Sequence, residues 1–432
     1  MLQNKTTKDL IDYIKVATAP YQVVEESIRQ LKENGFNELT MGTEWNIERG
    51  GSYYVAPFAT SIFAFTVGMK WEKNQSLRIT SSHTDHPGFR VKPNGEMKSG
   101  KYLKLNTEVY GGPILNTWLD RPLSIAGRVA LRSEDPFHPE MRLIDVKKQI
   151  LTIPNLAIHV NREVNKGVEL NKQIDTLPLV GMINESLEEK SFFINFLADR
   201  LGVKKEDILD YDMYIYNAEE GGVIGINDEF IACPRLDNLT SCIASLKGIT
   251  LGRREQGINI AALYDNEEIG SRTKQGADSA LLTMIIEKIY KGLGVANSEG
   301  LTEALSDSML LSVDVAHAVH PNKPEKYDPI NQPFLNEGIV FKIDSNQRYT
   351  YDTEAIAILQ QICEASDVKY QKFVNRSDMS GGGTLGPIIS SWLPMKTVDI
   401  GVPLLAMHSA REMMGAKDQE YLEKLLISFY QL

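Results

Sequence analysis

Cysteine is scarce in this sequence, and the few cysteines present form no pair with a functional spacing. The three residues Cys233, Cys242 and Cys363 are odd in number and include no CxxC motif. A disulfide framework and a thiolate zinc site are therefore not indicated. The opening residues, MLQNKTTKDLIDYIK, carry charge throughout and lack the apolar core of a secretory signal. We expect a cytoplasmic protein.

Long apolar runs and excess positive charge are also missing. No stretch approaches the roughly eighteen apolar residues that a membrane span needs, so no membrane association is expected. The formal net charge of -11 disfavours nucleic acid as a partner, because phosphates require a basic face. The chain of 432 residues, 42% hydrophobic and 24% charged, has ordinary globular composition and predicts two domains, or one with a large insertion.

The hydrophobic pattern predicts an α/β fold interrupted by a β-rich insertion. Two helices are expected within the first 35 residues, followed by the β runs SYYVAP, TSIFAFTVG and LRITSS. From about residue 94 to residue 232, glycine-punctuated β runs predict an insertion with its own core. After Pro234, helical and β runs alternate. This alternation predicts a mixed, largely parallel sheet sandwiched by helices.

Side chains that bind metals follow three apolar β runs. His83 follows LRITSS, Glu267 and Glu268 lie just beyond INIAALY, and Asp314 follows MLLSV. Because the carboxyl ends of strands in an open α/β sheet form the usual ligand site, we expect these side chains to converge. Imidazole and carboxylate without thiolate suit zinc, manganese or cobalt in a catalytic site.

Two further residues bring the candidate ligands to five, which is too many for one four-coordinate ion. They are Asp237 in PRLDNL and His408 in LLAMHSARE. If Asp237 bridges two ions, the other ligands divide into His83 with Asp314, and Glu268 with His408. Two metals about 3.5–4 Å apart can activate a water and polarise a carbonyl.

Two acidic residues next to these ligands have a different predicted role. Asp85, on the same face of an extended segment as His83, could orient the imidazole. Glu267 adjoins a ligand without needing to be one, so it can take a proton from a water. Each motif alone is more often a turn, a cap or a solvated surface. The hypothesis of a two-metal site rests on the occurrence of all these motifs together in one chain.

The chain resembles the aspartyl aminopeptidase and vacuolar aminopeptidase I family of metallopeptidases. Eight segments carry the resemblance, in family order over nearly the whole chain: HTDHPGFRVKP, TWLDRPLSIAGRV, IPNLAIHVNR, PRLDNLTS, YDNEEIGSRTKQGA, SVDVAHAVHPN, FKIDSNQRY and DIGVPLLAMHSARE. The resemblance implies a catalytic metallopeptidase domain of the zinc-exopeptidase type (residues 1–93 and 233–432). It also implies an inserted dimerisation domain (residues 94–232). Two zinc ions per subunit are expected, which manganese or cobalt can replace.

The resemblance also assigns roles to individual residues. Its implied metal ligands agree with the five derived from the sequence: His83, Asp237, Glu268, Asp314 and His408. Glu267 is the implied base and Asp85 the implied orienter. His159, which by itself is only a histidine in an apolar run, is implied to reach a neighbouring subunit's active site and is a further possible metal ligand. His317 and Lys342 are implied substrate contacts, and self-association is implied, with a dimer as the minimum and a dodecamer as the full assembly.

Two positions depart from the family pattern, and the substrate remains open between alternatives. His86 stands where a small residue is common and is either a spare metal ligand or, the interpretation we favour, part of the pocket wall, while Gly383 stands where serine is common. The expected function is removal of amino-terminal residues, preferably Asp or Glu, from peptides with a free amino terminus. The alternatives are a neutral or apolar preference, another two-metal hydrolase such as a carboxypeptidase or deacylase, and a non-catalytic assembly protein.

Overall fold

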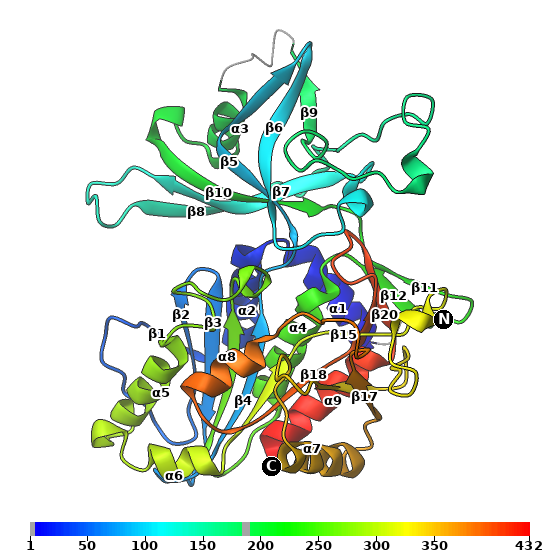
Figure 1. Cartoon of the computed structure of the whole chain (residues 1–432). Coiled ribbons are helices and arrows are strands. Elements are labelled where there is room, and N and C mark those ends of the chain that lie inside the picture. The colour runs from blue at the N-terminus through cyan, green and yellow to red at the C-terminus, as the bar shows by residue number, and fades with distance from the viewer. Residues whose placement is uncertain (1–4, 184–190) are drawn as a thin grey trace. The chain divides into compact units, whose positions relative to one another are not determined.

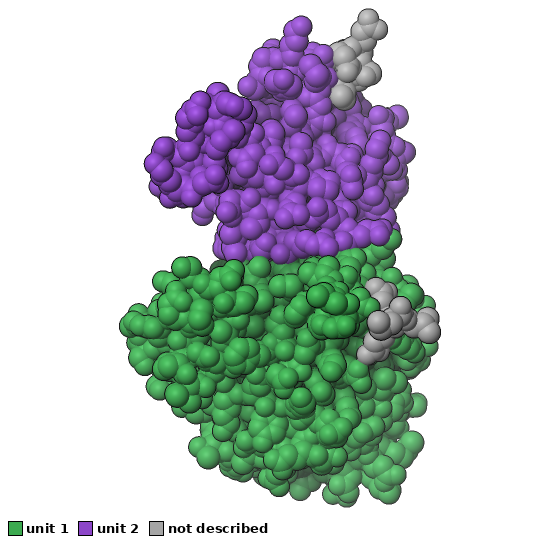
Figure 2. Space-filling view, turned by 90° about the vertical axis from the view of Figure 1, so that its right-hand side faces the viewer, with its two compact units in different colours: residues 1–85, 221–407, 412–432 green, residues 86–220, 408–411 purple. Residues whose placement is uncertain are grey.

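The computed structural model describes residues 5–183 and 191–432, which form two compact units (Figures 1 and 2). Unit 1 comprises Met1–Asp85, Gly221–Met407 and Glu412–Leu432, and unit 2 comprises His86–Glu220 and His408–Arg411. The expected insertion, residues 94–232, shares residues 94–220 with unit 2; its role in dimerisation stays a prediction. Within the described ranges, no helix is both long and apolar enough to cross a membrane.

A nine-stranded mixed sheet forms the centre of unit 1 (Figure 1). Five of its eight neighbouring strand pairs are parallel, which confirms the expected α/β fold with a largely parallel sheet. In spatial order the strands are β1 (Asn37–Leu39), β2 (Ser52–Phe58), β3 (Ser61–Val67), β13 (Ile258–Tyr264), β4 (Leu77–His83), β14 (Met309–Val313), β18 (Lys396–Gly401), β16 (Ile339–Ile343) and β17 (Tyr370–Val374).

Helices cover both faces of this sheet because its strands are apolar on both sides. In β13, Ala261 and Leu263 belong to one hydrophobic cluster, and Ile260 and Ala262 belong to another. This alternation is the period of two expected for a strand buried on both faces. The first cluster includes residues of α1 (Lys5–Val16), α2 (Pro20–Glu33), α4 (Leu236–Leu251), α7 (Thr353–Ala365) and α9 (Asp418–Gln431). The second includes residues of α5 (Leu281–Gly292), α6 (Leu301–Ser306) and α8 (Leu385–Trp392).

A second, five-stranded sheet belongs to the same unit. Its order is β11 (Gly222–Ile224), β12 (Phe230–Cys233), β20 (Glu412–Gly415), β19 (Pro403–Leu405) and β15 (Ala316–His317). The short β15 follows β14 after two residues, so the apolar run MLLSVDVAHA forms two strands in different sheets. This break places Asp314 in the connection between them.

Unit 2 is built on a six-stranded antiparallel sheet with its own core. The order is β8 (Glu140–Asp145), β7 (Leu123–Leu131), β10 (Ile208–Asn217), β5 (Gly88–Ser99), β6 (Tyr102–Tyr110) and β9 (Leu179–Met182). Helix α3 (Phe192–Leu201) contributes Phe193 and Leu197 to the core, where Phe89 packs edge-on against Trp118. The separate core matches the β-rich texture expected of this segment.

Candidate metal centre

The register of three parallel strands brings the predicted ligands to one edge of the main sheet. His83 ends β4 and stands opposite Tyr264 at the end of β13. Ser312 of β14 stands opposite Ser81 of β4 in a parallel pair. Asp314 therefore follows Ser312 by the same two residues that separate His83 from Ser81, and both reach the same level of the sheet.

The imidazole of His83 is oriented so that one nitrogen faces carboxylates. Its Nδ1 lies 3.0 Å from the carbonyl oxygen of Asp85, an acceptor, so Nδ1 carries the proton. Its Nε2 lies 3.3 Å from Oδ1 of Asp237 and 3.5 Å from Oδ1 of Asp314. The lone pair of Nε2 and two acidic oxygens thus converge on one point, as ligands of a shared cation do.

Burial makes this arrangement electrostatically demanding. The side chains of His83, Asp85 and Asp237 are almost fully buried. Burial alone lowers the pKa of His83, but the carboxylates of Asp237, Asp314 and Asp85 outweigh it and raise this pKa well above its usual value. The site therefore favours a positive charge at the position of Nε2.

A metal ion fits this demand. His83, Asp237 and Glu268 each offer a ligand atom, and these atoms lie within 4.8 Å of one another. One imidazole and two carboxylates without thiolate form the donor set of a catalytic zinc site. Asp314 adds a further carboxylate on the Nε2 side of His83.

Asp85 connects His83 to the predicted base. Its Oδ1 lies 3.4 Å from Nδ1 of His83 and accepts a hydrogen bond of 3.1 Å from the backbone N–H of Glu267. Its Oδ2 accepts a hydrogen bond of 3.1 Å from the N–H of Glu268. One buried carboxylate therefore fixes both the imidazole and the short 3-10 helix, Glu267–Ile269, that carries the two glutamates.

Glu267 has an environment that suits proton transfer. Burial is the main cause that raises the pKa of its carboxyl to about 8, and the charges of Asp314, Asp85 and Asp237 add to it while His83 opposes it. A carboxylate with raised proton affinity at the edge of a metal site has the character of a general base.

Comparison with known proteins places the chain in a family. The family model described as "Aminopeptidase I zinc metalloprotease (M18)" matches residues 13–430. The chain belongs to the M18 family of aminopeptidases. It is thus a zinc metalloprotease, a hydrolase that acts at the amino terminus of peptides, and the expected family is confirmed.

Relatives of this family and solved structures match nearly the whole chain. A probable M18 family aminopeptidase 2 of Clostridium acetobutylicum is 47% identical over 426 residues, covering 98% of each chain. The cryo-EM structure of the Ape4 and Nbr1 complex contains a chain with 34% identity and a TM-score of 0.94, covering 99% of this chain and 85% of that one. The S. cerevisiae mApe1 dodecamer has 25% identity and a TM-score of 0.86, covering 99% and 96%.

Lys342 of this M18 aminopeptidase contacts a predicted ligand. Its side chain is buried, and its Nζ lies 3.3 Å from Oδ2 of Asp314 and donates to the carbonyl of Val315 at 2.9 Å. The ammonium also lies 5.2 Å from the ring centroid of Tyr349. Burial raises the pKa of Asp314, but Lys342 and His83 outweigh it and lower this pKa below its usual value.

Three residues to which the sequence assigned no role at the site bond to the backbone at or next to predicted ligands. Oε2 of the buried Glu412 accepts the backbone N–H of Asp237 at 3.0 Å. The side chain of Asn238 donates to the carbonyl of Val313 at 3.0 Å, and the thiol of Cys242 lies 3.0 Å from the carbonyl of His83. The sequence offered one signal for a role of Glu412 at the site, which is its position shortly after His408 in HSARE.

The remaining predicted residues have different surroundings. His317 is half-buried on β15, its ring centroid 5.7 Å from that of Phe373. His86 is buried in unit 2, and His159 lies exposed in a turn of the same unit. Gly383 is exposed, and a Cβ there would meet nothing within 4 Å, so packing does not require glycine.

His408 groups with unit 2 although the sequence placed it with the catalytic segment. Its carbonyl accepts the N–H of Ile114, and its Nδ1 lies 3.1 Å from the carbonyl of Gly112. Ala410, two residues on, is bonded to Thr117 and Asn217 of the same unit. Because Nδ1 faces a carbonyl oxygen, an acceptor, Nδ1 carries the proton of this imidazole.

Proposed function

We propose that this enzyme is a two-zinc aminopeptidase in which Glu267 is the general base. The observation that carries the proposal is the convergence of Nε2 of His83 with carboxylate oxygens of Asp237 and Asp314. Asp237 would bridge the ions, with His83 and Asp314 on one and Glu268 and His408 on the other. The grouping of His83, Asp237 and Glu268 supports Asp237 as the shared ligand.

The chain's own residues would then perform the proton transfers. Bound zinc would polarise the scissile carbonyl and lower the pKa of a bound water. Glu267 accepts the proton of the attacking water and passes it to the leaving amine. Asp85 would hold the 3-10 helix Glu267–Ile269 and the imidazole of His83 in fixed positions through three contacts. His317 would contact the substrate.

An acidic amino-terminal residue is the proposed preference, with Lys342 as its contact. An ammonium has three N–H donors, and the contacts to Asp314 and Val315 use two of them. The third could bind an Asp or Glu side chain of the substrate. The pairing with Asp314 favours the rival, a neutral preference, because it already balances the charge of Lys342.

Self-association is proposed from the surface around His159. Leu156, Ile158 and Val160 flank it with 61%, 48% and 72% of their side chains exposed. Exposed apolar residues in one short segment mark an interaction site. Because mApe1 forms a dodecamer, we propose an assembly of at least a dimer, with His159 completing a neighbouring subunit's site or binding its metal.

A peptide panel tests the proposal. Asp-, Asn- and Leu-peptides with free and acetylated amino termini would be assayed together with elemental analysis of the enzyme. The proposal requires cleavage of free termini only and two zinc ions per chain. Cleavage of acetylated peptides, or full activity with one ion per chain, would contradict it.

A further inference from the structure

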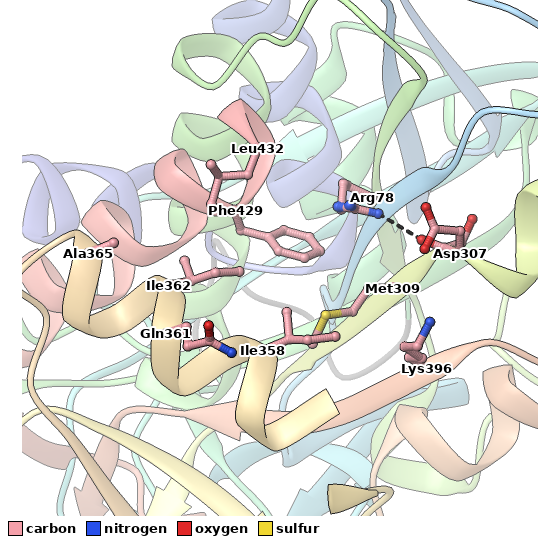
Figure 3. A pocket seen from close by; sticks show the side chains of 11 residues that line it. Arg78, Asp307, Met309, Ile358, Gln361, Ile362, Ala365, Lys396, Phe429 and Leu432 are labelled. Carbon is pink, nitrogen blue, oxygen red and sulfur yellow. Dashed lines mark hydrogen bonds between the residues drawn. The ribbon is translucent and has the colours of Figure 1, made fainter. Parts of the chain in front are cut away.

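A cavity of about 420 Å³ lies in unit 1 where several strands of the main sheet begin (Figure 3). Arg78 is the second residue of β4, and Met309 and Lys396 are the first residues of β14 and β18. The three strands run parallel, so the cavity lies at the edge opposite to that of the metal ligands. Arg78 and His83, at the two ends of β4, are on the order of 16 Å apart.

One side of the cavity is charged. Figure 3 shows Arg78, Asp307 and Lys396 together on this side. Nη1 of Arg78 donates to the carbonyl of Asp307 at 3.1 Å. Nζ of Lys396 donates to the carbonyl of Ser306 at 3.1 Å and lies 3.5 Å from the exposed carboxylate of Glu354.

Positive charge is in excess at this side. Arg78 interacts electrostatically with Arg254, whose guanidinium donates to the carbonyl of Ile258 and the hydroxyl of Ser76. Among the described residues, neither guanidinium forms an ion pair. Burial and then the charge of Arg78 lower the pKa of Arg254 to about 9, while Asp307 opposes both. The charge of Asp307 acts on both guanidinium groups, and a bound anion would stabilise them further.

The other side of the cavity is mostly apolar, with the amide of Gln361 as its polar group. Ile358 and Ile362 of α7, Phe429 of α9 and Met309 of β14 present their side chains to it (Figure 3). A cavity with an apolar wall and a few polar groups at one end has the usual form of a small-molecule site, and about 420 Å³ suits a small ligand.

We propose that this cavity binds a small aliphatic carboxylate, whose carboxylate lies between Arg78 and Lys396 and whose tail packs against Ile358, Ile362 and Phe429. Guanidinium and carboxylate match as planar, bidentate partners. Two sources share this chemistry: a free apolar amino acid and a simple aliphatic acid. Because the cavity is at the opposite sheet edge, its occupant is not the substrate.

Binding of three matched probes to the full-length, zinc-loaded enzyme tests the proposal. The probes are L-leucine, 4-methylpentanoate, which lacks the amino group, and 3-methylbutylamine, which lacks the carboxylate. By calorimetry, 4-methylpentanoate should bind and the amine should not. Leucine binding that Lys396→Met weakens assigns the site to amino acids, whereas binding of 4-methylpentanoate alone assigns it to simple acids.

Cavity variants separate this site from the metal centre. Lys396→Met should weaken binding of 4-methylpentanoate about tenfold or more, the effect of losing one charged hydrogen bond. Ile358→Trp should abolish it by filling the cavity, and both variants should keep peptidase activity. Lys372→Met, at an exposed lysine of β17, is the charge-matched control. Equal binding of the amine, or unchanged binding in both cavity variants, would overturn the proposal.

Discussion

Replacing Asp85 with asparagine should disable the enzyme at two points at once. The carboxylate faces Nδ1 of His83 with Oδ1 and accepts the N–H groups of Glu267 and Glu268 with its two oxygens. Asparagine keeps the shape but offers only one acceptor oxygen. In one orientation its amide N–H₂ replaces Oδ1 and faces the protonated Nδ1 of His83 and the N–H of Glu267. In the other it replaces Oδ2 and faces the N–H of Glu268.

The size of the effect follows from these contacts. A hydrogen bond to a charged group contributes about 1.5–3 kcal/mol, and Asp85 is fully buried, so solvent does not screen the loss. A loss of about 3 kcal/mol corresponds to roughly 100-fold or more in kcat/KM. Because the orientation of His83 also weakens, zinc affinity should fall by about 10- to 100-fold.

The assay measures kcat/KM on an amino-terminal peptide substrate, in parallel with zinc titration. Asp328→Asn is the matched control, since Oδ1 of Asp328 also accepts two backbone N–H groups, those of Ile330 and Asn331, on an irregular segment. The control should leave activity unchanged. If Asp85→Asn keeps zinc affinity and turnover within about threefold of wild type, Asp85 does not position the site.

Four further outcomes are expected. Chelation should abolish activity, and zinc, manganese or cobalt should restore it; full activity in a preparation shown by elemental analysis to be metal-free would exclude a metal mechanism. Glu267→Gln should retain metal and lose at least about 100-fold in kcat, whereas Glu268→Gln should lose metal occupancy; the reverse pattern would exchange their roles. Lys342→Met should lower kcat/KM for Asp-peptides about 10- to 100-fold relative to Asn- and Leu-peptides; an equal loss on all three would mean that Lys342 acts through Asp314 instead. His159→Ala should impair turnover, and mixing it with Glu267→Gln subunits should restore part of it; a fully active monomer by light scattering would refute a shared site.

Much of the candidate metal centre could be predicted because the sequence shows where three of the strands end. LRITSS, INIAALY and MLLSV have the character of strands, and the candidate metal-binding residues His83, Glu268 and Asp314 follow them directly or within four positions. Runs of this kind become strands buried on both faces, as β4, β13 and β14 are. Once the strands are parallel neighbours, His83 and Asp314 must meet.

Contacts between residues that are far apart in the chain could not be predicted from the sequence. The pairing of Lys342 with Asp314 depends on the order of β14, β18 and β16 in the sheet, which no local pattern encodes. The contact of Glu412 with Asp237 depends on the register of β20 against β12, where Glu412 stands opposite Cys233. Similarly, residues 408–411 group with unit 2 through hydrogen bonds to the N–H of Ile114 and the hydroxyl of Thr117, which composition does not encode.

The residues around the ligands explain how a site with so many buried acids can persist. Like charges at this distance repel, so the carboxylates of Asp237 and Asp314 would separate unless other bonds held them. Glu412 holds the N–H of Asp237, Asn238 ties the same segment to the end of β14, and Lys342 holds both Asp314 and the next carbonyl. Most of these bonds engage the backbone at or next to Asp237 and Asp314, and they leave the Oδ1 atoms of both carboxylates directed at Nε2 of His83. These hydrogen bonds are made by the protein itself and do not depend on a bound ion. We therefore expect that zinc can be removed and added back without unfolding of the sheet.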